Sequence, residues 1–142
     1  VQYCNTNADC SSIGSRSFCG LTLGDPVIAT VCTTGCDPAA TNNGCADDIH
    51  CLFFEEESTG DLYTHCALAA GTGTTGSTCS ETDGTEDCAV GYFCGQVSTG
   101  VYECVRRCTM PGGSECGAFE TCNSFDPILT SGGTEYGFCW AN

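Results

Sequence analysis

The chain contains no lysine, and Arg16, Arg106 and Arg107 are its only arginines. Against them stand 18 aspartate and glutamate residues, so the formal net charge at pH 7 is −15. This charge argues against nucleic acid and anionic membrane surfaces as partners, and it leaves cations, basic proteins and carbohydrate open. The simplest reason for the acidity is the solubility of a secreted protein.

Close cysteine pairs are also absent. Cys-x-x-Cys, Cys-x-Cys and Cys-Cys do not occur, although 16 of the 142 residues are cysteine. Zinc and iron–sulfur sites need neighbouring thiolates that converge on one ion. So high a cysteine content in a short chain is instead typical of a disulfide scaffold, which persists in oxidising compartments. We therefore predict disulfides throughout and a mature, secreted extracellular chain whose signal peptide has been removed.

Signals for membrane insertion and for catalysis are missing as well. No apolar run approaches 18 residues, and neither Gly-x-Ser-x-Gly nor His-Glu-x-x-His occurs. We predict no membrane insertion in this chain and no enzymatic activity. The two histidines, His50 and His65, each adjoin a cysteine. With the thiols oxidised, we expect ordinary hairpin-surface histidines rather than metal ligands.

What the sequence does contain is an internal duplication. Asp9-Cys10 followed by Phe18-Cys19-Gly20 returns as Asp87-Cys88 followed by Phe93-Cys94-Gly95. The cysteines align in two rows of eight, which are Cys4, Cys10, Cys19, Cys32, Cys36, Cys45, Cys51 and Cys66 over Cys79, Cys88, Cys94, Cys104, Cys108, Cys116, Cys122 and Cys139. Eight cysteines allow about 105 pairings per module, so the sequence leaves the connectivity open.

The duplication predicts two cysteine-rich modules, residues 1–70 and 79–142, joined by a Gly/Thr linker at 71–78. The linker composition is typical of a flexible tether, although packing of the modules edge to edge stays open. Loops are expected elsewhere, with at most one helical turn at Cys45–Asp48.

Each module is predicted to form two β-hairpins, because β-rich runs flank turn residues. The predicted strand pairs are residues 17–23 with 27–33, 51–57 with 61–66, 92–97 with 101–106, and two strands between Cys122 and Cys139. The expected fold is thus small, disulfide-rich and β-dominated, with polar loops and almost no helix.

The cysteine order resembles that of a known family. The order is clearest from Cys79 to Cys122, where it reads Cys, Asp-Cys, Gly-x-Phe-Cys, Cys-x3-Cys and two further cysteines. It resembles the modules of secreted signalling antagonists of the Dickkopf type. With the lead-in at 71–78, it is also similar to tandem cysteine-rich repeats of bacterial extracytoplasmic and outer-surface proteins. The chain lacks the adjacent cysteine pair and the basic inter-module loop of Dickkopf modules, which argues against a receptor-antagonist role. The resemblance implies a secreted cysteine-rich protein and assigns no functional residue.

Candidate functional residues stand where the modules differ. Arg106 and Arg107 lie between Cys104 and Cys108, in what we interpret as a rigid loop that presents arginine to a protease or an acidic neighbour. The simpler alternative is a local salt bridge to nearby carboxylates. The other candidate partner contacts are exposed aromatic residues, namely Phe53, Phe54 and Trp140.

One acidic run supplies weak candidates for calcium ligands, namely Glu81, Asp83, Glu86 and Asp87. The run lacks the ligand order of an EF-hand loop, and a solvated acidic face is its commoner meaning. Otherwise we expect no metal and no cofactor.

The leading functional hypothesis is a non-enzymatic, secreted structural protein of an extracellular surface, sheath or self-assembling filament, whose partner is another copy of itself. Crosslinking along the whole chain and the internal repeat favour it. Against polymerisation, a charge of −15 per copy is repulsive and must be masked by salt, cations or low pH. The alternative is a secreted binding module (an adhesin, protease inhibitor, toxin or receptor ligand) that binds another extracellular protein or a glycan.

Overall fold

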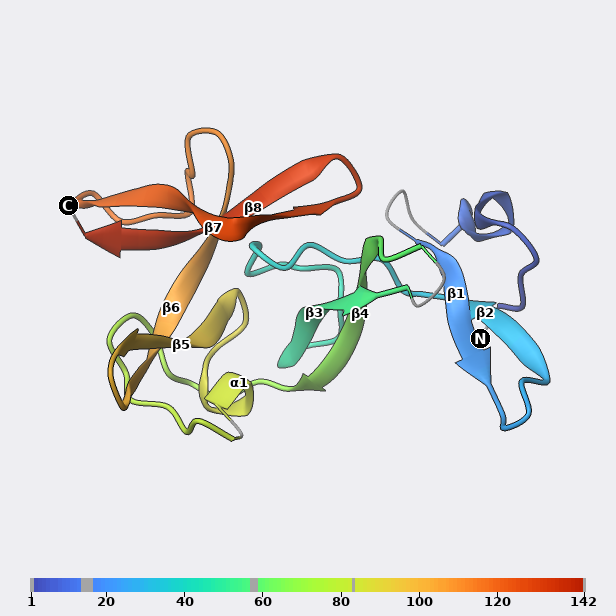
Figure 1. The fold of residues 1–142 in the computed structure, drawn as a ribbon, viewed down its shortest axis with the longest axis horizontal. Helices are drawn as coiled ribbons and strands as arrows, with labels where there is room; N and C mark the ends of the chain where they lie inside the picture. Colours follow the sequence, from blue (N-terminus) through green and yellow to red (C-terminus); the bar gives the residue numbers. More distant parts are fainter. Residues whose placement is uncertain (1, 14–16, 57–58, 83, 142) are drawn as a thin grey trace.

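The computed structural model describes residues 2–13, 17–56, 59–82 and 84–141, and four β-hairpins follow one another along this chain (Figure 1). The small, disulfide-rich β fold predicted from the sequence is confirmed. The strands are β1 (Cys19–Leu23), β2 (Ala29–Cys32), β3 (Ile49–Glu55), β4 (Leu62–Ala69), β5 (Tyr92–Ser98), β6 (Val101–Thr109), β7 (Glu120–Ser131) and β8 (Thr134–Ala141).

The four hairpins share one disulfide arrangement. In each hairpin, the two cysteines that face each other across the strands, such as Cys19 and Cys32, bond to cysteines earlier in the chain. The disulfides are Cys4–Cys19, Cys10–Cys32, Cys36–Cys51, Cys45–Cys66, Cys79–Cys94, Cys88–Cys104, Cys108–Cys122 and Cys116–Cys139. Each group of four successive cysteines therefore bonds first to third and second to fourth. The repeating unit is half of the duplicated module.

The disulfides form much of the interior. All sixteen cysteines lie within the described ranges, and none is free. No disulfide joins residues 1–70 to residues 79–142. Closing a loop of about 15 residues contributes roughly 3 kcal/mol in the chain-entropy account, which suits units too small to build a large apolar core.

Two short helices occupy equivalent places before the second cysteine of each module. They are η1 (Asn7–Cys10) and α1 (Gly84–Asp87). The repeated Asp-Cys pair has a structural role here. Asp9 Oδ2 accepts the main-chain N–H of Asn5 at 2.8 Å, and Asp87 Oδ2 accepts that of Ser80 at 2.8 Å. Residues Cys45–Asp48, for which at most one helical turn was predicted, adopt bends and a turn.

The predicted Gly/Thr linker is hydrogen-bonded into module 2 rather than running as a free tether. Gly71 N–H donates to Cys88 O at 2.9 Å, and Gly73 N–H donates to Asp87 O at 3.0 Å. A Cβ at position 71 would lie 2.4 Å from Asp87 O, so this close approach requires glycine. On the other side, Ala70 N–H donates to Asp48 O at 2.7 Å. Adjacent residues are thus anchored to different modules.

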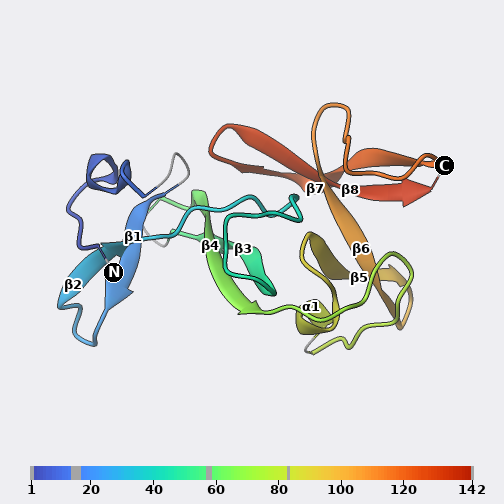
Figure 2. The same cartoon turned by 180° about the vertical axis from the view of Figure 1, so that it is seen from behind.

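The two modules differ in their sheets. In module 1, β1 pairs only with β2 and β3 only with β4, whereas module 2 forms one sheet of order β5-β6-β8-β7. The cause is the length of β6, which continues through Arg107, Cys108 and Thr109 to pair with β8. Figure 1 and its reverse view, Figure 2, show β6 running between the two hairpins that it joins.

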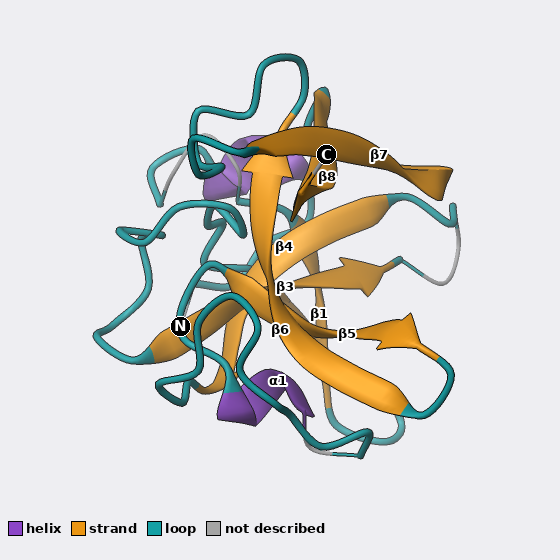
Figure 3. Cartoon of the chain, turned by 90° about the vertical axis from the view of Figure 1, so that its left-hand side faces the viewer, coloured by secondary structure: helices purple, strands orange, loops and turns teal. Residues whose placement is uncertain are grey.

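The molecule is elongated. The β1–β2 hairpin lies at one end of the long axis, and the end of β8 lies at the other (Figures 1 and 2). Seen along this axis in Figure 3, strands and loops make up nearly all of the cross-section.

Candidate functional site

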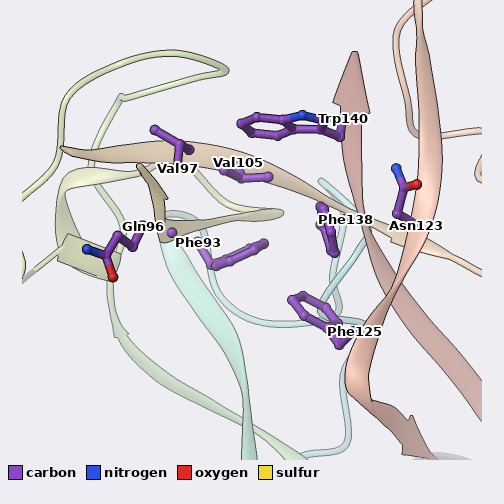
Figure 4. A pocket seen from close by; sticks show the side chains of 9 residues that line it. Phe93, Gln96, Val97, Val105, Asn123, Phe125, Phe138 and Trp140 are labelled. Carbon is purple, nitrogen blue, oxygen red and sulfur yellow. The ribbon is translucent and has the colours of Figure 1, made fainter. Parts of the chain in front are cut away.

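The four-stranded sheet of module 2 carries an apolar groove. Successive side chains of a strand point to opposite faces, so Phe93, Gly95 and Val97 of β5 share a face, and Phe138 and Trp140 of β8 do the same. The groove has a volume of about 460 Å³ and is lined by Phe93, Gly95, Gln96, Val97, Val105, Asn123, Phe125, Phe138 and Trp140. Figure 4 shows these side chains around the opening between the two hairpins.

Four aromatic rings dominate the lining. The Phe93 and Phe125 ring centroids lie 5.6 Å apart, and those of Phe125 and Phe138 lie 5.1 Å apart, both pairs tilted. Trp140 lies on the far side of Val105 from this row in Figure 4, and its side chain is 45 % exposed. An indole so exposed beside other aromatic rings is typical of a binding surface.

The polar groups of the groove are uncharged. None of the lining residues carries a formal charge, although the whole chain carries −15. The amide of Asn123 is oriented by a hydrogen bond from its Nδ2 to the carbonyl of Thr121 at 2.9 Å. Gln96 is exposed, and its amide points away from the aromatic rings in Figure 4.

Module 1 offers an internal comparison. Counting from the cysteines, Ala67 follows Cys66 where Trp140 follows Cys139. The aromatic rings of module 1 stack on one another, since Tyr63 lies 5.3 Å from Phe18 and 5.8 Å from Phe54.

The residue that corresponds to Tyr63 in module 2 is Tyr136, and it is fully buried. Its ring meets Phe53 of module 1 at 5.1 Å, edge to face. Module 2 therefore differs from module 1 in two ways: Trp140 lines the groove, and Tyr136 packs at the junction between the modules instead of lining the groove.

Arg107 packs against a ring of the groove wall. Its guanidinium lies 4.7 Å from the ring centroid of Phe93 and 5.2 Å from that of Phe53. Burial lowers the pKa of Arg107 to about 10, so the side chain stays protonated at neutral pH. A stack from Phe53 through Arg107 to Phe93 thus connects module 1 to the wall of the groove.

The sequence interpretation of Arg106 and Arg107 was wrong in two respects. Both belong to strand β6 rather than to a loop, and neither pairs with a carboxylate in the part of the chain that the structure describes. Arg106 is buried, donates from Nη1 to Gly91 O at 2.6 Å, and lies over the Tyr92 ring at 5.3 Å. Arg107 faces module 1 because β6 continues as a strand that pairs with β8. The local sequence does not reveal this pairing.

The expectation of surface histidines was wrong for His50. Its side chain is 2 % exposed, and Nε2 has no hydrogen-bond partner within 3.5 Å. Burial lowers the pKa of His50, while the nearby carbonyls of Thr85 and Cys88 in module 2 act in the opposite direction. His65 is half-buried, accepts the N–H of Thr34 at Nδ1 at 3.1 Å, and has its pKa lowered by burial.

The remaining candidates lie apart from the groove. Phe53 packs on Tyr136 and Arg107, and Phe54 stacks on Tyr63, so both take part in internal packing. Of the calcium candidates, Asp83 lies outside the described residues. Asp87 binds the Ser80 N–H, and Glu81 hydrogen-bonds Tyr102 and raises its pKa. The structure brings only Trp140 of the predicted contacts into the groove. The other lining residues come from strands distant in sequence, so local patterns did not identify them.

Comparison with known proteins adds no identification, because no protein-family model, curated protein or solved structure matches this chain. Among the described residues, no helix is long and apolar enough to cross a membrane. The eight disulfides indicate an oxidising, extracellular or secretory environment.

Proposed function

We propose that this protein is a non-enzymatic, extracellular structural protein whose copies associate through the aromatic groove of module 2. The observation that carries the proposal is an open apolar groove with a half-exposed tryptophan, set in an elongated chain that disulfides crosslink in every repeat. Exposed apolar surface of this kind on a secreted protein is typical of an interaction site.

Charge sets the conditions for association. Two copies that each carry −15 repel one another, so a contact is most favourable where few charges meet. The uncharged lining of the groove meets that condition. We expect association to strengthen with ionic strength, because salt screens the repulsion but leaves apolar contact intact.

A second candidate is a binding module for an uncharged, hydroxyl-rich ligand such as a glycan. The observation that favours it is that two uncharged amide residues, Gln96 and Asn123, line the groove together with the aromatic rings. An apolar site with a few polar groups is typical of ligand pockets. The Arg107 cation already lies 4.7 Å from the Phe93 ring centroid, which disfavours a cationic ligand at that ring.

Sedimentation velocity of the unreduced protein at low and high salt tests the proposal. We expect the wild-type protein to form salt-dependent oligomers and Trp140→Ala to remain monomeric under the same conditions. Phe119→Ala is the matched control, because Phe119 is 88 % exposed but does not line the groove. Since Trp140 is half-exposed, its replacement leaves the disulfide core intact.

Two results would contradict this proposal. A wild-type protein that stays monomeric at every salt concentration and pH would exclude a self-assembling structural protein. If that monomer changed its Trp140 fluorescence on addition of a neutral oligosaccharide, the second candidate would replace the first. Trp140 is the only tryptophan, so the signal reports on the groove directly.

A further inference from the structure

An apolar loop protrudes at the end of the molecule opposite the groove. It connects β1 to β2, and its three large aliphatic side chains, which we call the β1–β2 tip, are Leu23, Val27 and Ile28. They are 40 %, 61 % and 80 % exposed. Three exposed aliphatic residues on one convex loop form a patch, whereas aliphatic residues exposed singly are normal on protein surfaces.

The tip has a defined conformation. The N–H of Ile28 donates to the carbonyl of Leu23 at 2.8 Å, which closes the loop. Pro26 fixes one backbone torsion at the turn, and Gly24 adopts φ +88°, a region that glycine enters without strain. A loop already held in one shape loses little conformational entropy when it docks.

The tip and the groove lie at opposite ends of the long axis, so the tip of one copy cannot enter its own groove (Figures 1 and 2). We propose that the β1–β2 tip of one copy docks into the aromatic groove of the next copy, head to tail. This inference rests on the proposed function and names the occupant of the groove.

Chemistry and charge fit this pairing. The tip is aliphatic, the groove is lined by aromatic and aliphatic side chains, and the groove volume of about 460 Å³ accommodates several aliphatic side chains. Asp25 is the only charged residue between Leu23 and Ile28, and no charged residue lines the groove. Docking therefore brings two strongly acidic chains together at the places where each has little charge.

The other exposed apolar residues fit less well. Phe119 and Ile128 are 88 % and 65 % exposed, but neither has another exposed large apolar residue within three positions in the sequence. Both also belong to module 2, the module that carries the groove.

Symmetry gives the consequence of the pairing. The two surfaces differ, so the contact is heterologous, and repetition of a heterologous contact that does not close into a ring produces an open filament. One loop in one groove buries less than the roughly 1,000 Å² of a stable complex, so we expect reversible, concentration-dependent association.

Two variants and their mixture test the inference in the unreduced 142-residue chain. Ile28→Asp places a charge on the tip, and we expect it to weaken association at least about tenfold, as burial of one large aliphatic side chain implies. Ile128→Asp makes the same change at an exposed site outside the groove and should associate like the wild type. Trp140→Ala disables the groove and leaves the tip intact.

The mixture separates a head-to-tail contact from any other. A Trp140→Ala copy offers only a tip, and an Ile28→Asp copy offers only a groove. We therefore expect each variant to be monomeric alone and the mixture to form a one-to-one dimer that grows no further. The emission of Trp140, present only in the Ile28→Asp copy, should change on mixing.

The outcomes distinguish this inference from the proposed function. Salt-dependent oligomers of Ile28→Asp equal to those of the wild type would overturn the tip as occupant and leave self-association standing. Failure of the mixture to dimerise, with both variants monomeric, would also overturn head-to-tail docking. A monomeric wild type would overturn both.

Discussion

Replacing Arg107 by methionine should leave the free energy of unfolding almost unchanged, although the arginine sits between two aromatic rings. Burial lowers the pKa of Arg107 from its ordinary value to about 10, which corresponds to roughly 3 kcal/mol of desolvation cost at about 1.4 kcal/mol per pH unit. Part of the side chain remains accessible to solvent, which reduces this cost. The two cation–π contacts, with Phe53 and Phe93, stabilise the folded state by about 1–2 kcal/mol each. The two effects nearly cancel.

Methionine keeps an unbranched apolar side chain between Phe53 and Phe93 and adds favourable sulfur–aromatic contacts. We therefore expect Arg107→Met to change stability by less than about 1 kcal/mol. Arg107→Ala leaves the space between the rings empty and should cost about 2–4 kcal/mol. It should also loosen Phe93 and shift the Trp140 emission.

Equilibrium unfolding in guanidinium chloride, with the disulfides intact, measures both variants by circular dichroism and by Trp140 fluorescence. If Arg107→Met were as unstable as Arg107→Ala, the charge itself would stabilise the junction and the balance above would be wrong. If Arg107→Ala were neutral, the side chain would not fill the space between the modules.

Two further predictions concern pH. Burial holds the pKa of His50 below the unfolded value of about 6.5, so the unfolded state binds more protons, and stability should fall as pH drops below 6.5. His50→Gln should reduce the pH dependence of the melting temperature between pH 7 and pH 5 more than His65→Gln does. An equal pH dependence in the two variants would count against a buried His50. Main-chain hydrogen bonds lower the pKa of Asp9. The stability it contributes is present above the unfolded pKa of about 3.9 and is lost as pH falls through the folded value. Asp9→Asn should therefore reduce the loss of melting temperature between pH 5 and pH 2. Asp25→Asn serves as the exposed control. If Asp9→Asn and the wild type lost melting temperature equally in acid, the role of the carboxylate would be refuted.

Much of the fold was predictable, because its determinants are local. The sequence runs 17–23 and 27–33 around Gly24-Asp25-Pro26 correspond to β1 and β2, and the other predicted pairs correspond to the remaining hairpins. β-branched and aromatic residues on either side of turn residues report a hairpin without knowledge of the rest of the chain. The cysteine content likewise indicated disulfides, since no spacing suited a metal site.

The sequence could not supply the pairing of the cysteines or the composition of the groove. Cys94 and Cys104 face each other on β5 and β6, yet they bond to Cys79 and Cys88, a choice made by the path of the preceding loop. The repeat of the resulting four-cysteine unit was not visible in the sequence, because the loops between its cysteines differ in length. The sequence also left open whether the Gly/Thr linker is a flexible tether or lies between packed modules, and main-chain hydrogen bonds join it to module 2.

The sequence by itself determined a crosslinked chain of β-hairpins with a strong negative charge, because residue counts and short-range patterns specify these properties. Only the tertiary structure placed Trp140 and Phe93, 47 positions apart in the chain, in the wall of one groove, and packed Arg107 against Phe53. Both follow from the extension of β6 onto β8, which joins two hairpins into one sheet. Pairing between strands far apart in the chain depends on the whole fold, and the groove is its product.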